Sequence, residues 1–589
     1  MRKTYCIVLA LAAGLVLPAC DKDDIVQPDP QENTVAGDDS AGGNIDTNQD
    51  DDDVAKTTFA RTIQVKYAGS SASVTGATAD FTVSVAGAGV TIKNNGSDAV
   101  IYELSGTASD GYFKLYSTRK QQLRLNGLTL TNTKGAAINN QSHKRTYVVV
   151  KGTNNLADGS SYTATPTDED EKAAFFSEGQ LVFSGDGSLT VKATGKAGIT
   201  SDDYVRFMAA PTIKVSSSAG HGVRGKEAII VSDGTIDVSV SGTGKKGFSS
   251  DTLVYVGGGV TTIQTTGSAG EVDGELTGVA GIKADLRFEM VDGSLTITST
   301  GTGAKGISGD NVAYFKGGTV DVNVTGANYG TSSGGGFGPG GGGPGGWPGG
   351  PGGQPGGGGS QSSSDNSVAS KAIKFDGNLY VSGGKITAKS SKHEALEAKG
   401  VIQITGGELY CYSSDDAVNS GGDLTVDGGY LFAQSTGNDA LDSNGDMYIK
   451  GGVVYAIGTK SPELAIDANS EQRKKLTLSG GTVIAIGGLE NGSTLSQKCW
   501  SAGTVKTNTD YALYDAGGKV IGAFKTPSAG SLALIVSAAN LSSVKYNVKV
   551  SGGTPYFGGL YTDGATVTDG SDCSLSAYSG GSGGGPGGW

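Results

Sequence analysis

Acidic and amide side chains recur at matching places in four consecutive segments of this sequence. Aligning the segments on the turn that follows a short strand pattern places these residues in two columns. Because equivalent residues of stacked parallel strands lie about 4.8 Å apart, carboxylates within one column would face one another closely. The first column contains Glu394, Asp416 and Asp439, with Glu463 nearby, and the second contains Glu397, Asn419, Asp442 and Asp467.

These columns have the composition of a site for a hard cation. Unpaired carboxylates at such spacing repel one another, and their pKa values rise. Calcium would remove that cost, because it takes about six to eight oxygen ligands and tolerates irregular geometry. The alternative is a solvated acidic edge that deters edge-to-edge pairing. The candidate calcium ligands are Glu394, Glu397, Asp415, Asp416, Asn419, Asp439, Asp442, Glu463 and Asp467. None of the three histidines has the spacing of a transition-metal site.

Sequence repeats must position these columns. Glycine pairs open successive repeats with starts 23, 22, 23 and 29 residues apart, at Gly383, Gly406, Gly428, Gly451 and Gly480. After each pair, apolar and polar residues alternate, which indicates a strand with one buried face. The predicted inward columns are Ile386, Leu409, Leu431, Val454 and Val483, and then Ala388, Cys411, Ala433, Ala456 and Ala485. A second short strand closes each repeat, and no connection is long enough for a crossover helix.

The pattern predicts an all-β fold, a right-handed parallel β-helix with about 22–25 residues per rung. We expect an N-terminal cap and a small C-terminal β-rich region at its two ends. The β-helix should occupy residues 59–500, interrupted by a flexible Gly/Pro-rich insertion at 328–367. Residues 501–589 should form the C-terminal region with its Gly-rich tail.

The N-terminal part of the chain has the features of a targeting segment. Residues 1–20 place Arg2 and Lys3 before an apolar run that ends in Leu17-Pro18-Ala19-Cys20, which resembles a bacterial lipobox. This predicts a lipoprotein signal peptide with lipid on Cys20, and the alternative is an ordinary secretory signal. Residues 21–58 should be a disordered acidic tether, since residues 21–53 hold twelve acidic residues and one lysine.

Charge and targeting together predict a location. The acidic residues directly after Cys20 resemble surface-export signals of some Gram-negative lipoproteins, so we expect a surface-exposed, lipid-anchored protein of the cell outer membrane. The net charge of −13 comes mostly from the tether, and nothing indicates a nucleic-acid partner. We expect a monomer. Cys499 and Cys573 could pair in an oxidising compartment, which the sequence leaves open.

The repeats resemble a known family. The segments KAIKFDGNLYVSGGKI, HEALEAKG, SSDDAVNSGGDL, STGNDALDSNGDMYIKGG and PELAIDAN are similar to those of bacterial carbohydrate-binding β-helix proteins over roughly residues 60–525. The resemblance implies a pectin-lyase-like architecture, bound calcium, and polysaccharide as the partner, either cellulose or acidic pectic glycans.

Two further columns could contact a glycan. The outward aromatic residues could lie under successive sugar rings, unless the C-terminal region or the insertion covers them. They are Tyr410, Phe432 and Tyr455, flanked by Tyr412 and Tyr430. Basic residues occupy the earlier rungs at Lys246, Lys305 and Lys371, and at Arg224, Lys283 and Lys374. They would suit a polyuronate, with Lys374 beside the acidic columns, or would simply balance nearby aspartates.

Three functions fit these features. The leading one is a surface-anchored lipoprotein that binds polysaccharide through a calcium-containing β-helix without catalysis. A second is a calcium-dependent polysaccharide lyase acting on polyuronates, with a base such as Lys374 or Arg224. A third is a structural or adhesive surface protein. The sequence does not decide whether the protein is an enzyme, because this fold hosts both binding proteins and enzymes.

Overall fold

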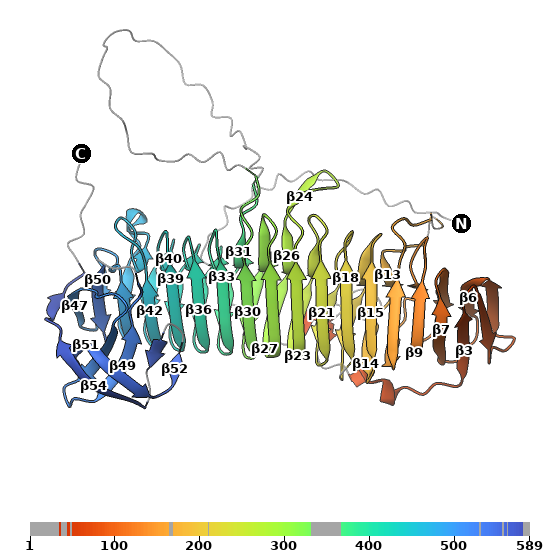
Figure 1. Ribbon diagram of the computed structural model, residues 1–589, viewed down its shortest axis with the longest axis horizontal. Coiled ribbons are helices and arrows are strands. Elements are labelled where there is room, and N and C mark those ends of the chain that lie inside the picture. Colours follow the sequence, from red (N-terminus) through yellow and green to blue (C-terminus); the bar gives the residue numbers. More distant parts are fainter. Residues whose placement is uncertain are drawn as a thin grey trace, which may run out of the picture.

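The protein is an elongated β-solenoid in a computed structural model (Figure 1). The structure describes residues 34–36, 44–46, 50–163, 166, 169–209, 211–330, 367–528, 532–556, 559–561 and 564–580. The predicted signal peptide with Cys20, the centre of the Gly/Pro-rich insertion and the tail from residue 581 lie outside these residues. Within the described residues, no helix is long and apolar enough to cross a membrane.

Fifteen strands form the sheet that carries the acidic columns, which we call the long sheet. Its strands, most of them parallel to their neighbours, are β5 (Phe81–Ala86), β6 (Ala88–Asn94), β8 (Gly111–Ser117), β10 (Ile138–Asn140), β13 (Ala173–Ser177), β16 (Ala197–Ser201), β19 (Val223–Gly225), β22 (Lys246–Ser250), β26 (Val279–Ala284), β28 (Ala304–Gly309), β31 (Lys371–Phe375), β34 (Leu396–Ala398), β37 (Val418–Ser420), β40 (Leu441–Ser443) and β43 (Ile466–Ala468).

Two more parallel ladders complete the solenoid and share the strands β9 (Gln121–Thr131), β23 (Leu253–Thr265) and β27 (Arg287–Ser299). One contains β11 (Thr146–Lys151), β14 (Leu181–Gly185), β17 (Tyr204–Phe207), β20 (Ala228–Val231), β29 (Val312–Phe315), β32 (Leu379–Val381), β35 (Ile402–Ile404), β38 (Leu424–Val426), β41 (Met447–Ile449), β44 (Leu476–Leu478) and β46 (Thr494–Leu495). The other contains β12 (Thr153–Ala157), β15 (Ser188–Ala193), β18 (Thr212–Ser217), β21 (Thr235–Val240), β30 (Thr319–Val324), β33 (Lys385–Ser390), β36 (Glu408–Ser413), β39 (Tyr430–Ser435), β42 (Val453–Ile457) and β45 (Thr482–Ile486).

The strand register confirms the predicted inward columns. Ile386 pairs with Leu409, and the same alignment continues through Leu431 and Val454 to Val483. These residues belong to one continuous apolar core inside the coil. The glycine pairs make the corners, because the second glycine of each has positive φ, as at Gly407 with φ +86°. A Cβ at Gly407 would also lie 2.9 Å from the backbone of Gly383 in the rung below.

Both ends of the solenoid are capped by antiparallel strands, as predicted. At the N-terminal end, β3 (Thr62–Ala68) pairs with β4 (Ser71–Thr75), and β5 pairs with β6; β3 also pairs in parallel with β7 (Val100–Ala108). At the other end, β50 (Ala533–Ser537) pairs antiparallel with β45 and with β47 (Cys499–Thr504), which also pairs with β55 (Ser576–Tyr578). Cys499 and Cys573 are both free thiols.

The C-terminal region adds a separate six-stranded antiparallel sheet, at the blue end of Figure 1. Its strands are β48 (Asp510–Asp515), β49 (Val520–Lys525), β51 (Leu541–Gly552), β52 (Pro555–Tyr556), β53 (Leu560–Tyr561) and β54 (Ala565–Asp572). This sheet packs over the outer face of the last rungs through a second apolar cluster. Its position decides the outcome for the predicted aromatic column.

The end of the predicted acidic tether is not disordered. Residues 50–56 form two short 3-10 helices, η1 (Asp50–Asp52) and η2 (Val54–Lys56), against the side of the solenoid. The Asp52 carboxylate is 2% exposed and pairs with Arg145 at 2.8 Å and with Arg206 at 3.0 Å. Two buried guanidinium groups thus fix a segment whose composition alone predicts disorder.

Candidate functional site

The outward face of the long sheet carries the polar side chains that could bind a ligand. Alternate residues of its strands, such as Phe113, Ile282 and Leu396, belong to the core, so the residues between them point outward. Along this face the side chains change from tyrosine and asparagine near β8, to lysine between β22 and β31, to carboxylate between β34 and β43. One continuous surface therefore holds three chemically distinct stretches.

The strand register places the acidic column as predicted. Glu397 pairs with Asn419, Asn419 with Asp442, and Asp442 with Asp467. Backbone hydrogen bonds link the preceding residues in the same order, from Ala395 to Asp416 and from Ala417 to Asp439. The two halves of this acidic stretch differ in how their charges are balanced.

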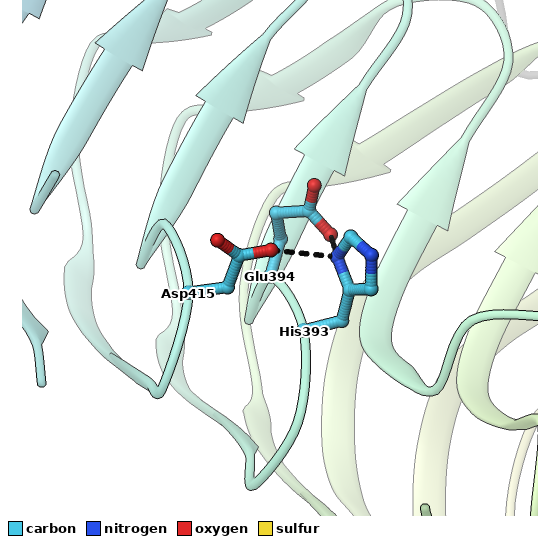
Figure 2. Close-up of side chains that lie close together, drawn as sticks. All are labelled: His393, Glu394 and Asp415. Carbon is cyan, nitrogen blue, oxygen red and sulfur yellow. Dashed lines mark hydrogen bonds and ion pairs between the residues drawn. The ribbon is translucent and has the colours of Figure 1, made fainter. Parts of the chain in front are cut away.

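Protein cations neutralise the first half. Lys371 Nζ lies 2.9 Å from a carboxylate oxygen of Glu394 and 2.5 Å from one of Glu397. His393 contacts Glu394 and lies 2.9 Å from Asp415 (Figure 2). The hydrogen bonds from Asp415 and Glu394 raise the pKa of His393 to about 9, so the imidazolium form is favoured at neutral pH.

The ion pairs also decide the charge of Glu394. Burial alone would raise its pKa, but His393 and Lys371 outweigh burial and hold the pKa at about 2. Glu394 is therefore ionised, and Glu397 and Asp415 also lie within ion-pair distance of basic side chains. Of the predicted calcium ligands, these three have the least need of an added cation.

The second half of the stretch lacks such partners. Among the described residues, no lysine, arginine or histidine nitrogen lies within 4.0 Å of the carboxylates of Asp416, Asp439, Asp442 or Asp467. Burial and the neighbouring carboxylates raise the pKa of Asp416 to about 8 and that of Asp442 to about 6. Burial raises the pKa of Asp439 to about 7, against the hydrogen bond it accepts from Leu464 N–H.

Three of these carboxylates converge. Asp439, Asp442 and Asp467 each offer an oxygen, and the three oxygens lie within 4.8 Å of one another. Asn419 Nδ2 donates to Asp416 and to Asp442, both at 2.8 Å, and so joins the two columns. The donor set contains only oxygen, which suits a hard cation such as calcium. The residues present therefore fit the predicted metal in this half.

A cavity of about 680 Å³ opens beside this cluster and is lined by Asp439, Glu463, Asp467 and Glu490. Glu490 was missed by sequence reasoning because it lies beyond the repeats, in the connection after β45. Burial and then Glu490 raise the pKa of Asp467. The side chain of Glu463 reaches the cavity but not the three-carboxylate cluster.

A second acidic group also escaped sequence reasoning. Asp170, Glu178 and Asp202 bring carboxylate oxygens within 4.8 Å of one another. Lys172 pairs with Asp170 at 2.6 Å and with Asp202 at 2.5 Å, so this group is partly neutralised. Asp170 lies in the connection before β13, outside the repeat pattern, so regular spacing did not indicate the group.

The predicted aromatic platform is covered, so the prediction that it binds glycan is wrong for its central residues. Phe432 and Tyr455 do stack in one outward column with Tyr410, but they are 5% and 0% exposed. The ring of Tyr455 packs on Phe524 at 5.4 Å, and its hydroxyl donates to the carbonyl of Lys525 at 2.7 Å. The C-terminal sheet buries this face because it is apolar.

The flanking aromatic residues are less enclosed. Tyr430 stacks on Tyr556 of the C-terminal region, with ring centroids 3.8 Å apart. Tyr410 is half-buried and stacks on Phe432 at 5.0 Å. Tyr412 is half-buried and lies in the outward row between Lys389 and Gln434. No row of exposed rings remains among these residues.

Three of the six predicted basic residues are balanced by aspartate. Arg224 forms a bidentate pair with Asp251 at 2.8 and 2.9 Å. Lys374, the predicted glycan contact, pairs with Asp376, and Lys283 pairs with Asp285 at 3.0 Å. For these three residues the charge-balance alternative describes the observed contacts.

A cavity of about 540 Å³ lies on the same face near the N-terminal end, and sequence reasoning did not identify it. Its walls include Tyr112, Lys114, Tyr116, Asn132, Asn139 and Glu171. Tyr112, Lys114 and Tyr116 alternate along β8 with the core residues Phe113 and Leu115. The first rungs lack the regular glycine pairs, so these residues could not be aligned from the sequence.

The fold and this polar face define the class of protein, a parallel β-solenoid with an extended binding surface. The family model of carbohydrate-binding domain-containing proteins matches residues 86–417, which is more than half of the chain, so the protein belongs to that family. The matched residues include the tyrosine and lysine stretches and end before the three-carboxylate cluster.

Other comparisons add little detail. No curated protein matches the sequence. A solved structure of a polysaccharide lyase-like protein from C. thermocellum, a gadolinium derivative, is similar at 19% identity with a TM-score of 0.35. The similarity covers 45% of this chain and 99% of that one.

Proposed function

We propose that this protein binds polysaccharide along the outward face of the long sheet and holds calcium at the acidic end of that face. Membership of the carbohydrate-binding family supports the polysaccharide. The observation that carries the location is the tyrosine-lined cavity, which lies within the family-matched residues on a face that the C-terminal sheet leaves open. Cellulose and acidic pectic glycans are the two substrate classes to test.

The N-terminal cavity has the chemistry to bind a sugar. The faces of Tyr112 and Tyr116 can pack on the axial C–H groups of a ring, as aromatic side chains do with apolar ring faces. Asn132 and Asn139 can each donate and accept hydrogen bonds to hydroxyl groups. The Glu169 carboxylate accepts from the Tyr116 hydroxyl at 2.6 Å and pairs with Lys114, which fixes two of the walls.

Calcium would occupy the cluster of Asp439, Asp442 and Asp467, with Asp416, Asn419 and Glu490 close by. Its charge would offset the repulsion among carboxylates that have no basic partner. When bound, the ion supplies a positive centre to which a uronate carboxylate or a sugar hydroxyl can coordinate. The chain itself holds the ligands in register through the strands β40 and β43.

The anchoring part of the proposal rests on residues 1–20 alone. The lipobox-like segment would attach lipid to Cys20 and place the solenoid at the outer membrane surface. Binding without catalysis is the form we favour, because the two candidate bases for a lyase, Arg224 and Lys374, are paired with Asp251 and Asp376.

Retention of the purified protein on immobilised cellulose and polygalacturonate, with Ca²⁺ or with chelator, tests the function. We expect retention on at least one glycan without release of unsaturated sugar, and its loss in the double variant Tyr112→Ala, Tyr116→Ala. Tyr448→Ala, an outward tyrosine on a different sheet, is the matched control. No retention on either glycan would refute polysaccharide binding, and unsaturated product would establish a lyase instead.

A further inference from the structure

The lysine stretch of the long sheet contains a cavity that the proposed function does not use. It measures about 250 Å³ and lies over β22, β26 and β28. One wall is the hairpin of β24 (Gly270–Val272) and β25 (Glu275–Thr277), which rises from the solenoid in Figure 1. The charged residues that line the cavity are Lys246, Lys283, Lys305, Lys374 and Asp310.

The four lysines divide into two kinds. Lys283 pairs with Asp285 and Asp310, and Lys374 pairs with Asp376, so both have carboxylate partners. Among the described residues, Lys246 and Lys305 have no carboxylate within 4.0 Å. Lys246 Nζ donates only to the carbonyl oxygen of Gly244, at 2.8 Å. Two ammonium groups therefore face the cavity without a counter-charge.

The strand register explains how both lysines reach one cavity. Lys246 pairs with Ala280, and Ala280 pairs with Lys305, so the two lysines stand two rungs apart in one column. Two rungs correspond to about 10 Å. The small side chain of Ala280 between them leaves the floor of the cavity open. Thr277 of the hairpin also lines the cavity.

The environment of these lysines disfavours positive charge in the absence of a ligand. Burial, and then the charges of neighbouring lysines, lower the pKa of both Lys246 and Lys305 to about 8. A bound anion would reverse both effects, because it supplies the missing counter-charge and accepts hydrogen bonds from both ammonium groups. An ordinary solvated lysine would not show this burial.

We propose that Lys246 and Lys305 form an oxyanion subsite, which takes a carboxylate or sulfate group carried by a glycan. The inference rests on the proposed polysaccharide-binding function and assigns the charge of one sugar substituent. A uronate carboxylate and a sulfate ester share the required chemistry, since both present negatively charged oxygens to two ammonium donors. Lys283 and Lys374 are weaker candidates for anion binding, because their ammonium groups already form ion pairs with aspartates.

The test compares the full-length protein with the double variant Lys246→Gln, Lys305→Gln. Lys192→Gln, Lys214→Gln is the matched control, because it removes the same charge from two exposed lysines of another sheet. Binding is measured by calorimetry in chelator for polygalacturonate, dextran sulfate, unsulfated dextran and cello-oligosaccharide. Sodium sulfate alone serves as a probe of the cavity. Melting curves check that each variant is folded.

We expect the subsite variant to lose about tenfold or more in affinity for one anionic polymer, from the loss of two charge-assisted hydrogen bonds. The control variant and the binding of neutral glycans should change less than twofold. Loss for polygalacturonate alone assigns a carboxylate, and loss for dextran sulfate alone assigns a sulfate ester.

The outcomes separate this inference from the proposed function. If the anionic glycans bind equally to the subsite variant and to the control variant, the oxyanion subsite is refuted and polysaccharide binding stands. If no glycan binds but sulfate binds in a manner that requires Lys246 and Lys305, the subsite stands and the polysaccharide function fails. If neither glycan nor sulfate binds the unmodified protein, both are refuted.

Discussion

The lysine stretch and the acidic stretch of the long sheet share one strand register but space their charges differently. In one column of the lysine stretch, serine separates successive basic residues, so that Ser249 lies between Arg224 and Lys283, and Ser308 between Lys283 and Lys374. In the acidic stretch, Asn419 separates Glu397 from Asp442, but Asp442 and Asp467 are direct neighbours.

This difference in spacing shows which charged side chains a solenoid can neutralise with its own residues. A charge with an uncharged residue on either side has room for an aspartate from an adjacent loop, as Asp251 does for Arg224. Adjacent carboxylates about 4.8 Å apart leave no such room and repel each other. The same backbone thus makes one basic column that nearby aspartates balance and one acidic column that favours an added cation.

Lys371 lies between the lysine stretch and the acidic stretch. Its removal should produce the largest loss of stability among the variants considered. Lys371→Met leaves Glu394 and Glu397 buried without their shared cation, which should lower the free energy of unfolding by about 3–5 kcal/mol. Chemical denaturation measures the change. Adding Glu394→Gln and Glu397→Gln to Lys371→Met should restore much of the stability. A loss below about 1 kcal/mol for the single variant would contradict the pairing.

Calcium should stabilise the acidic stretch. At a hundredfold excess over its dissociation constant, a ligand that binds only the folded state adds about 2.7 kcal/mol, so the melting temperature should rise. Asp442→Asn, Asp467→Asn should abolish the rise, whereas the exposed pair Asp237→Asn, Asp321→Asn should keep it. An equal rise in both double variants would place calcium elsewhere.

Lys246 and Lys305 should make the folded protein more stable as pH rises. A lysine in a stabilising ion pair does the opposite, because its contribution to stability is lost as pH rises. The pKa values of Lys246 and Lys305 are about 8 in the folded protein and 10.5 for an ordinary lysine, so the unfolded chain binds more protons between these pH values. Stability should therefore increase by roughly 1–3 kcal/mol per lysine as pH rises from 8 to 10.5.

Thermal melting of the unmodified protein and of Lys246→Gln, Lys305→Gln across this pH range measures the lysine contribution. The variant should be more stable near pH 8, where Lys246 and Lys305 of the unmodified protein are each about half charged. Its stability should also change less with pH, because the contribution of the two lysines is absent. Parallel profiles for the two proteins would show that neither lysine has a lowered pKa.

The smallest expected effect concerns His393 at the start of the acidic stretch. Hydrogen bonds to Asp415 and Glu394 raise the pKa of His393 to about 9, and the bond to Asp415 has the larger effect. Asp415→Asn weakens that bond, so the pKa should fall toward 6.5. The raised pKa stabilises the fold fully below pH 6.5, and this contribution disappears as pH rises through 9. NMR titration of the imidazole measures the shift, and an unchanged value would contradict the contact in Figure 2.

The sequence predicted the features that repeat. Regular glycine pairs and alternating residues were sufficient to assign the columns from Ile386 to Val483 and the register from Glu397 to Asp467. Such columns follow from local geometry, because every rung places its residues in the same way.

The features that do not repeat could not be predicted from the sequence. The C-terminal sheet covers Phe432 and Tyr455 through contacts with residues such as Phe524, about 70–90 positions later in the chain. The cavity around Tyr112 and Tyr116 needs a loop near Thr163 that lies outside the repeat pattern. Both depend on how distant segments fold back onto the solenoid, and neither has a periodic signal.

The Asp52 contact sets the path by which mechanical tension would enter the solenoid. Tyr204 donates to Asp52 at 2.6 Å, so the segment at residues 50–59 is fastened to rungs well inside the solenoid and not to its N-terminal tip. A pull on the chain before residue 50 would reach the pairs with Arg145 and Arg206 before it reaches β3, the first strand of the N-terminal cap. The cap strands would be shielded from peeling, and a protein tethered through this segment would be held by its flank.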